Sequence, residues 1–329
     1  MQPNKNIKIF INYFLGPILF AWLAYSIYRQ IRNQPQLEAS WRQILTAFDS
    51  YKIIYLLVAI LLMPLNWSIE AVKWKLSVQG VQPVSFFKSL RAVLAGVSFS
   101  VTMPNRVGEY LGRMLYLPEG SRLKAISVTL VSSFAQLLVT LMAGTVALLA
   151  LKNTLLQHFP DLRIWSRFIL SGLLMIDLLA LLIYFNVAGE AAWIKKWIGR
   201  ERYGYLLEAV KLFDLSLLIQ LVLLSLLRYA VFITQYILLF YFFEVNIDIP
   251  TILAVMAIVF LAMALIPSIA LVEVWLRGEI LIVLMGIFSS NTLGIGFVSV
   301  TIWFFNLILP AIMGSLLLLN LRIFRKKSE

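Results

Sequence analysis

Six long, predominantly apolar stretches dominate this sequence of 329 residues. A helix needs about 20 apolar residues to cross the hydrocarbon core of a bilayer, and each of these stretches meets that requirement. They lie at residues 9–28, 53–72, 125–151, 168–188, 215–243 and 295–320. Charged residues make up only 13% of the chain, whereas soluble domains have roughly a quarter. The sequence therefore predicts an all-α, polytopic integral membrane protein, with residues 1–329 forming a single transmembrane domain.

The composition excludes several kinds of chemistry. The chain has no cysteine and one histidine, so neither thiolate chemistry nor a histidine-based metal cluster is available. It also lacks a Walker loop, HExxH, GxSxG and Asp-rich metal motifs. We therefore expect no enzyme activity and no cofactor. The net charge of +12 favours anionic membrane lipids as partners, because the basic residues are scattered over short loops rather than clustered as in nucleic-acid sites. A homo-oligomer or a partner enzyme is a further possibility.

The distribution of basic residues predicts the orientation. With a cytoplasmic N-terminus and six alternating spans, most of the 28 basic residues fall inside, which predicts that both termini are cytoplasmic. The expected location is a bacterial cytoplasmic (inner) membrane. The first stretch has no cleavage-like site after it and is interpreted as an uncleaved anchor. The outer segment 29–52 is basic too, but Leu37, Trp41, Leu45 and Phe48 share one helical face. They predict an amphipathic helix in the interface.

Polar residues interrupt the apolar pattern in "VTMPNRVGEYLGRML", residues 101–115. The flanking segments, 73–91 and Lys124, are predicted to be cytoplasmic, so the chain between them must enter and leave on the same side. The apolar segment 92–103 is too short to span, and Pro104 ends its helix. We expect a re-entrant hairpin surrounded by protein or water, because lipid cannot satisfy its non-helical backbone.

A second segment, "LIPSIALVEVWLRGEIL" at residues 265–281, repeats this pattern. In both segments a glutamate follows a proline by five or six positions, and an arginine follows the glutamate by four. The two sets are Pro104, Glu109 and Arg113, and Pro267, Glu273 and Arg277. The i, i+4 spacing places the carboxylate and the guanidinium on one helical face.

Each of these segments lies between two long spans, and the two units have opposite topology. This predicts an inverted repeat, with repeat one at about 53–151 and repeat two at about 215–320. Its two re-entrant hairpins would meet near the midplane. With six full spans and the two hairpin regions, the fold has six to eight transmembrane helices, and whether residues 250–290 form a hairpin or two full spans stays open.

Charged residues inside a span cost on the order of 3 kcal/mol each and need a partner or a water-filled cavity. The candidate substrate-binding residues are polar groups of the two hairpins and of the span before the first. They are Asn66, Glu70, Asn105, Arg106, Glu109, Arg113, Glu273 and Arg277. Arginine forks match phosphate, and a helix N-terminus after Pro104 adds backbone donors, so a phosphate-bearing lipid headgroup is the natural ligand. Structural ion pairing is the alternative, and it is preferred for Asp177 and Arg228.

The stretch "MPNRVGEYLGRMLYLPEGSRLKAISVTLVSSFAQLLVTLMAG" resembles the signature region of the lysylphosphatidylglycerol synthase transmembrane family, also called the flippase-like domain family. Members typically show a proline, a Gly/Ala/Asn-Arg pair, Gly-Glu, a nearby arginine and then a long span. The matching positions here are Pro104, Asn105, Arg106, Gly108, Glu109 and Arg113. "LNWSIEAVKWKLSVQG" is similar to the preceding family segment, in which a basic-Trp pair, here Lys73 and Trp74, ends a span.

The resemblance implies translocation of a phospholipid or lipid-linked headgroup between leaflets, through a polar groove between the hairpins. The second family motif is usually glycine-rich, whereas this sequence has "SIALV" between Pro267 and Glu273. Larger members carry a soluble aminoacyl transferase, and we expect a stand-alone member without it. The alternative function is a non-catalytic accessory subunit of a lipid- or glycan-modifying enzyme. An intramembrane transferase has less support.

Overall fold

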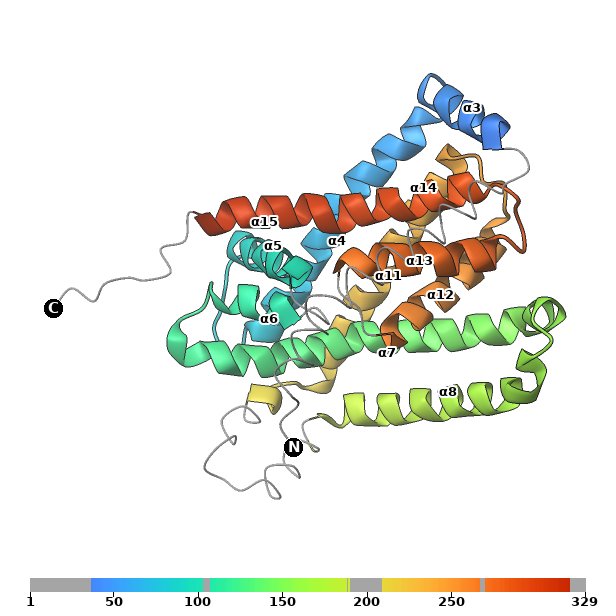
Figure 1. Ribbon diagram of the computed structural model, residues 1–329. Helices are drawn as coiled ribbons and strands as arrows, with labels where there is room; N and C mark the ends of the chain where they lie inside the picture. The colour runs from blue at the N-terminus through green and yellow to red at the C-terminus, as the bar shows by residue number, and fades with distance from the viewer. Residues whose placement is uncertain (1–36, 103–106, 188, 190–208, 267–269, 320–329) are drawn as a thin grey trace, which may run out of the picture.

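The computed structural model describes residues 37–102, 107–187, 189, 209–266 and 270–319, whose regular secondary structure is entirely helical (Figure 1). The helices are α3 (Leu37–Phe48), α4 (Ile53–Val78), α5 (Phe86–Thr102), α6 (Val107–Met114), α7 (Glu119–His158), α8 (Leu162–Phe185), α11 (Leu215–Phe242), α12 (Ile249–Leu265), α13 (Ala270–Met285), α14 (Thr292–Trp303), the π-helix η3 (Phe304–Ile308) and α15 (Leu309–Leu319). The predicted all-α fold is confirmed.

Within the described residues, five helical segments are long and apolar enough to cross a membrane. They are α4, α7, α8, α11 and the continuous segment α14–η3–α15. These match five of the six predicted spans, and the sixth, residues 9–28, lies outside the described residues. The predicted amphipathic helix forms as α3, and the ring of its Phe48 packs edge-on against the ring of Phe242 with 4.9 Å between the ring centroids.

Helix α4 extends further than the sequence predicted. The span was expected to end at residue 72, with Lys73 and Trp74 at its cytoplasmic end, but the helix continues to Val78. Both side chains are buried. The apolar pattern stops at the lysine, but the helix does not, because Glu70, one turn earlier, neutralises Lys73 inside the protein.

Two pairs of shorter helices complete the fold. Helices α5 and α6 have 17 and 8 residues, and α12 and α13 have 17 and 16. At about 1.5 Å per residue, none of the four is as long as the roughly 30 Å hydrocarbon core. Helix α5 begins at Phe86, earlier than the apolar segment 92–103 suggested, because the preceding residues 86–91, which mix aromatic and basic side chains, also belong to the helix.

The two short pairs lie toward opposite ends of the long helices (Figure 1). Helix α5 packs on α15, where the Ser98 hydroxyl donates a hydrogen bond to the Ala311 carbonyl at 2.6 Å. Helix α12 packs on the second half of α7, where Ala147 and Ala257 belong to one buried cluster. The long helices thus form a frame that holds one short pair near each end.

Glycines bring α6 directly onto the backbone of α5. A Cβ atom added to Gly112 would lie 2.5 Å from the Cα of Gly96, and one added to Gly108 would lie 2.2 Å from the carbonyl carbon of Phe99. Real Cβ atoms do not approach that closely, so only glycine permits this packing. The close packing sets the position of Glu109, which lies between the two glycines of α6.

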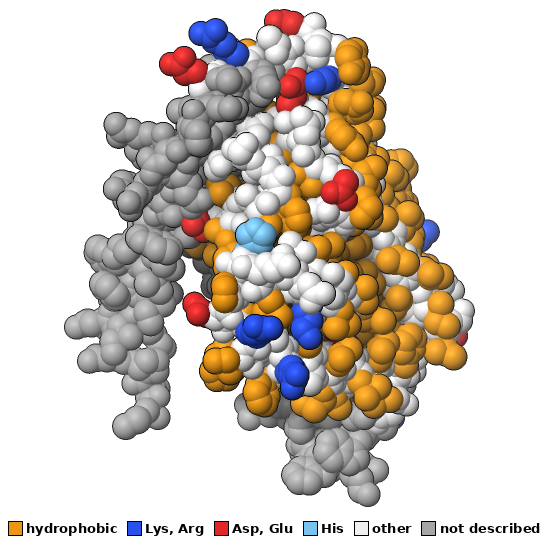
Figure 2. Space-filling view, turned by 90° about the vertical axis from the view of Figure 1, so that its right-hand side faces the viewer, with side chains coloured by type: hydrophobic (Ala, Val, Ile, Leu, Met, Phe, Trp, Pro, Cys, Tyr) orange, Lys and Arg blue, Asp and Glu red, His pale blue; other side chains and the backbone are white. Residues whose placement is uncertain are grey.

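The outer surface of the bundle is apolar. On α8, Phe168, Met175 and Leu178 are all more than half exposed. Figure 2 looks onto the end of the molecule where α7 gives way to α8: His158 lies at this surface, and hydrophobic side chains cover the adjoining flank. Such a continuous apolar surface is typical of a protein that faces lipid rather than water.

Candidate functional site

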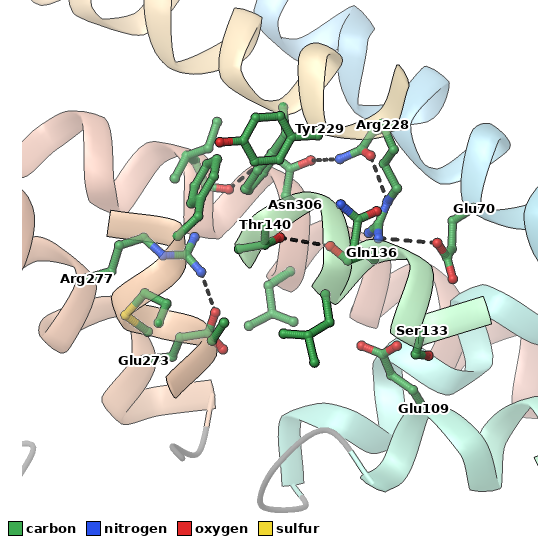
Figure 3. Close-up of a pocket in the computed structure, with 18 of the residues that line it drawn as sticks. Glu70, Glu109, Ser133, Gln136, Thr140, Arg228, Tyr229, Glu273, Arg277 and Asn306 are labelled. Atoms are coloured by element: carbon green, nitrogen blue, oxygen red, sulfur yellow. Dashed lines mark hydrogen bonds and ion pairs between the residues drawn. The ribbon is translucent and has the colours of Figure 1, made fainter. Parts of the chain in front are cut away.

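A cavity of about 540 Å³ lies among the helices (Figure 3). Its volume falls in the range of about 300–1,000 Å³ that is usual for small-ligand sites. Side chains of α4, α6, α7, α11, α12, α13, α14 and η3 line it, so both short pairs contribute. Three acidic and three basic side chains are among them. They are Glu70, Glu109, Glu273, Lys73, Arg228 and Arg277.

Glu70 on α4 is the centre of a buried ion cluster. Its Oε1 accepts a hydrogen bond from Nη2 of Arg113 on α6 at 2.9 Å. Its Oε2 lies 3.3 Å from Nζ of Lys73 and 3.2 Å from Nη1 of Arg228. One carboxylate therefore holds cations from three helices together. Removing such a charge is costly, because its buried partners would remain unneutralised.

Arg113 lies behind the carboxylates that face the cavity. Its Nη2 is also 3.2 Å from Oε2 of Glu109, one helical turn earlier on α6. Arg113 is only 2% exposed and does not line the cavity, whereas Glu109 does. Together with Glu70, Lys73 and Arg228, these side chains carry three positive and two negative charges. Within the part of the chain that the structure describes, the cluster thus has a net charge of +1, which a single anion would balance.

The second short pair brings another ion pair to the same cavity. Glu273 and Arg277 form a salt bridge along one face of α13, as their i, i+4 spacing predicted. Arg277 also donates from Nη1 to the Tyr236 hydroxyl of α11 at 3.4 Å. In Figure 3 the Glu273 and Glu109 side chains extend toward the cavity from opposite sides.

A chain of amide side chains leads away from Arg228. The Arg228 Nε donates to Asn66 Oδ1 at 3.0 Å, and Asn66 Nδ2 donates to Asn306 Oδ1 at 3.2 Å. Asn306 Nδ2 then donates to Gln235 Oε1 at 3.1 Å, and Gln235 Nε2 donates to the Ala59 carbonyl at 2.9 Å. Asn306 belongs to the π-helix η3, a local irregularity that is frequent at functional sites.

Most of the sequence-predicted site residues come together. Those that line the cavity are Asn66, Glu70, Glu109, Glu273 and Arg277. Arg113 is buried behind them, and Asn105 and Arg106 lie outside the described residues.

Arg228 and Asp177, which were both expected to form structural ion pairs, differ in their surroundings. Arg228 does pair with Glu70, but it also lines the cavity. Asp177 is buried on α8 away from the cavity, and its Oδ1 has no hydrogen-bond partner in the part of the chain that the structure describes.

Sequence reasoning missed the roles of Asn306 and Lys73. Asn306 is a polar residue inside the predicted span 295–320, and the rule that intramembrane polar groups face the protein interior would have indicated it. Lys73 was assigned to a cytoplasmic flank. Its i, i+3 spacing from Glu70 was the available signal that the two charges neutralise each other.

The fold and the cavity define a polytopic, all-helical membrane protein with an internal charged site. The family described as the lysylphosphatidylglycerol synthase TM region matches residues 13–314, and the chain belongs to this family. No curated protein and no solved structure matches the chain. Among the described residues, no group of three or more metal-ligating side chains could hold a metal ion.

Proposed function

We propose that the protein moves a phospholipid or a lipid-linked headgroup between the leaflets of a bacterial cytoplasmic membrane, as a flippase-like transporter. The headgroup would pass through the charged cavity while its acyl chains stay in the bilayer. The observation that carries this proposal is that charged side chains from both short helix pairs line one cavity. Charges at membrane depth are costly and typically mark substrate paths. Membership of the family supports a lipid-related role.

In this proposal the two short pairs are re-entrant hairpins of an inverted repeat. Helices α5 and α6 would enter from the cytoplasm, and α12 and α13 from the opposite side. Their short lengths and their packing toward opposite ends of the long helices support this arrangement. Inverted-repeat transporters bind their substrates where such broken helices meet.

The proposed ligand carries a phosphate group. Among the described residues, the cluster of Glu70 with Lys73, Glu109, Arg113 and Arg228 has one positive charge in excess, and an anion in the cavity would balance it. Guanidinium groups suit phosphate because their planar N–H donors match its oxygens. The transport step needs no bond chemistry, so the proposal includes neither a catalytic residue nor a cofactor.

A specific observation favours a second candidate function, an accessory subunit of a lipid- or glycan-modifying enzyme. Each of the six charged side chains that line the cavity contacts an opposite charge. A cluster that is closed in this way can also serve to hold helices in place, without any passage of substrate.

A leaflet-resolved lipid transport assay in proteoliposomes separates the two candidates. Purified protein is reconstituted with fluorescent lipids that differ in headgroup, and the movement between leaflets is followed with a membrane-impermeant quencher. We expect at least one phosphate-bearing lipid to move faster than in protein-free vesicles. Glu109→Gln and Glu273→Gln should slow it, whereas Glu119→Gln, at an exposed position that begins α7, should not. A panel in which no lipid is accelerated rejects the transporter proposal.

A further inference from the structure

We propose that Arg228 is the residue that contacts the phosphate oxygen of the ligand, and that the amide chain through Asn66, Asn306 and Gln235 positions its guanidinium. The inference rests on the proposed function, since it assigns a role within the same cavity. It is tested by equilibrium binding, so its failure can be told apart from a failure of transport.

The guanidinium of Arg228 is held on three sides. Its Nε donates to Asn66 Oδ1 at 3.0 Å, and its Nη1 lies 3.2 Å from Glu70 Oε2. One face lies over the ring of Trp67, with 5.2 Å between Cζ and the ring centroid. An arginine side chain has five N–H donors, so these contacts leave both N–H groups of Nη2. Among the described residues, none accepts a hydrogen bond from Nη2.

Of the cations at this cavity, Arg228 is the most accessible. Its side chain is 21% exposed, compared with 1% for Lys73, 3% for Arg113 and 9% for Arg277. Lys73 is occupied by Glu70 and by the Ser225 hydroxyl at 3.2 Å. Arg113 does not line the cavity. Among the cations that line the cavity in the described part of the chain, Arg228 is therefore the one most open to a phosphate oxygen.

The amide chain restricts the orientation of this fork. Every link has the same direction: each amide donates through its nitrogen to the next oxygen, from Asn66 through Asn306 and Gln235 to the Ala59 carbonyl. Hydrogen bonds aligned in this way polarise one another and strengthen the chain. Among the described residues, Arg228 Nε is the donor that the Asn66 oxygen accepts from. Asn306 is thus a positioning residue, which acts on the ligand through Arg228.

The position of the Asn306 side chain depends on the π-helix. Residues Phe304–Ile308 interrupt the regular α-helix between α14 and α15. Asn306 is 9% exposed and bonds to α4 and α11 at once. A π-turn widens the helix by one residue and changes the direction of its side chains. We infer that this irregularity places the amide between Asn66 and Gln235.

The test measures binding of two probes to protein in phosphatidylcholine nanodiscs by isothermal titration calorimetry. The probes are dihexanoyl phosphatidylglycerol below its micelle concentration and inorganic phosphate. Arg228→Lys keeps the charge but loses the fork, and it should weaken binding about tenfold or more, because an ammonium group cannot replace the paired donors of the guanidinium. Asn306→Leu should weaken binding less, by about threefold to tenfold, because a hydrogen bond between neutral groups contributes less than one to a charged group.

A double-mutant cycle separates positioning from simple structural support. If Asn306 acts through Arg228, Asn306→Leu should weaken binding no further once Arg228 is already lysine. The matched control is Thr234→Val on α11, because this residue is exposed and its hydroxyl donates to the Ala230 carbonyl of its own helix. It should bind like the wild type. Should Asn306→Leu fail to fold, Gln235→Met interrupts the same chain one link further away.

Three results would overturn the proposal. The first is that Arg228→Lys binds the probes with wild-type affinity. The second is that the Arg228→Lys, Asn306→Leu double variant loses affinity by the product of the two single losses. The third is that neither probe binds measurably to the wild type. The two probes also distinguish the source of the phosphate. If Arg228→Lys weakens the binding of both probes equally, Arg228 contacts phosphate and the site accepts phosphate in general. If it weakens the binding of the lipid alone, Arg228 contacts phosphate in an esterified headgroup. Lipid binding that depends on Arg228, without transport, would reject the transporter but retain this assignment.

Discussion

Arg113 on α6 and Glu70 on α4 are 43 positions apart in the sequence, yet they form a buried hydrogen bond of 2.9 Å. This pair connects the first short helix pair to a membrane-spanning helix. It also orients Glu70 toward Lys73 and Arg228. The cluster is therefore both an internal support for the fold and one wall of the cavity.

The charge balance of this cluster predicts a ranking of stabilities. Arg113→Met breaks the buried pair between Arg113 and Glu70 but leaves Glu70 with two cations, so it should lower the free energy of unfolding by about 3 kcal/mol, the low end for a broken buried pair. Glu70→Gln leaves two buried cations, Lys73 and Arg113, and the partly exposed Arg228 with Glu109 as the remaining carboxylate of the cluster, and it should cost more. Equilibrium unfolding in mixed micelles measures both.

The control for this ranking is Glu244→Gln. Glu244 pairs with Lys52 at 2.7 Å, but the two side chains are 20% and 28% exposed. A pair in contact with solvent contributes below about 1 kcal/mol, so this variant should unfold almost like the wild type. If all three variants lower the free energy of unfolding equally, the buried cluster stabilises the fold no more than an ion pair in contact with solvent does.

The glycine contact between α5 and α6 should be sensitive to a single methyl group. Gly112→Ala places a Cβ atom 2.5 Å from the Cα of Gly96 and forces the helices apart, at a cost of about 1–3 kcal/mol. Gly172→Ala on α8 is the matched control, because no heavy atom lies within 4 Å of its added Cβ. Thermal unfolding of both variants is the measurement. Equal midpoints would contradict the packing described here.

The orientation remains a prediction from the distribution of basic residues. The chain lacks cysteine, so single cysteines can be introduced without a background. Gly120→Cys, at the start of α7, and Ser328→Cys should react from the cytoplasmic side with an impermeant maleimide. Asn246→Cys, in the turn between α11 and α12, should react from the opposite side. Labelling of all three from one side would contradict the alternating spans.

The sequence predicted features that depend on local pattern. Hydropathy placed α8 and α11 because a long apolar run can hardly fold otherwise in a membrane. The i, i+4 spacing of Glu273 and Arg277 predicted their salt bridge, since neighbouring turns of one helix bring such residues together.

Features that depend on packing between helices were not predictable in this way. Nothing in a single sequence specifies the register between α4 and α6, which decides that Glu70 meets Arg113. The same holds for Asn306, whose two amide partners come from α4 and α11. Lys73 was misplaced for a related reason, since its burial is tolerated only because of the carboxylate beside it.

The Glu273–Arg277 pair offers the last test, because a structural pair and a working pair respond differently to neutralisation. If the two residues only stabilise each other, replacing both with glutamine should preserve the fold and the transport rate, since a buried ion pair contributes little net stability. If the pair interacts with the headgroup, the double variant should fold but lose most of its transport, because the charges on this side of the cavity are gone. Unfolding and lipid movement measured on the same reconstituted sample distinguish these results. We expect retained folding with transport reduced at least tenfold, which corresponds to about 1.4 kcal/mol of transition-state stabilisation. A fully active double variant would assign α13 to the architecture and leave α4 and α11 as the functional side of the cavity.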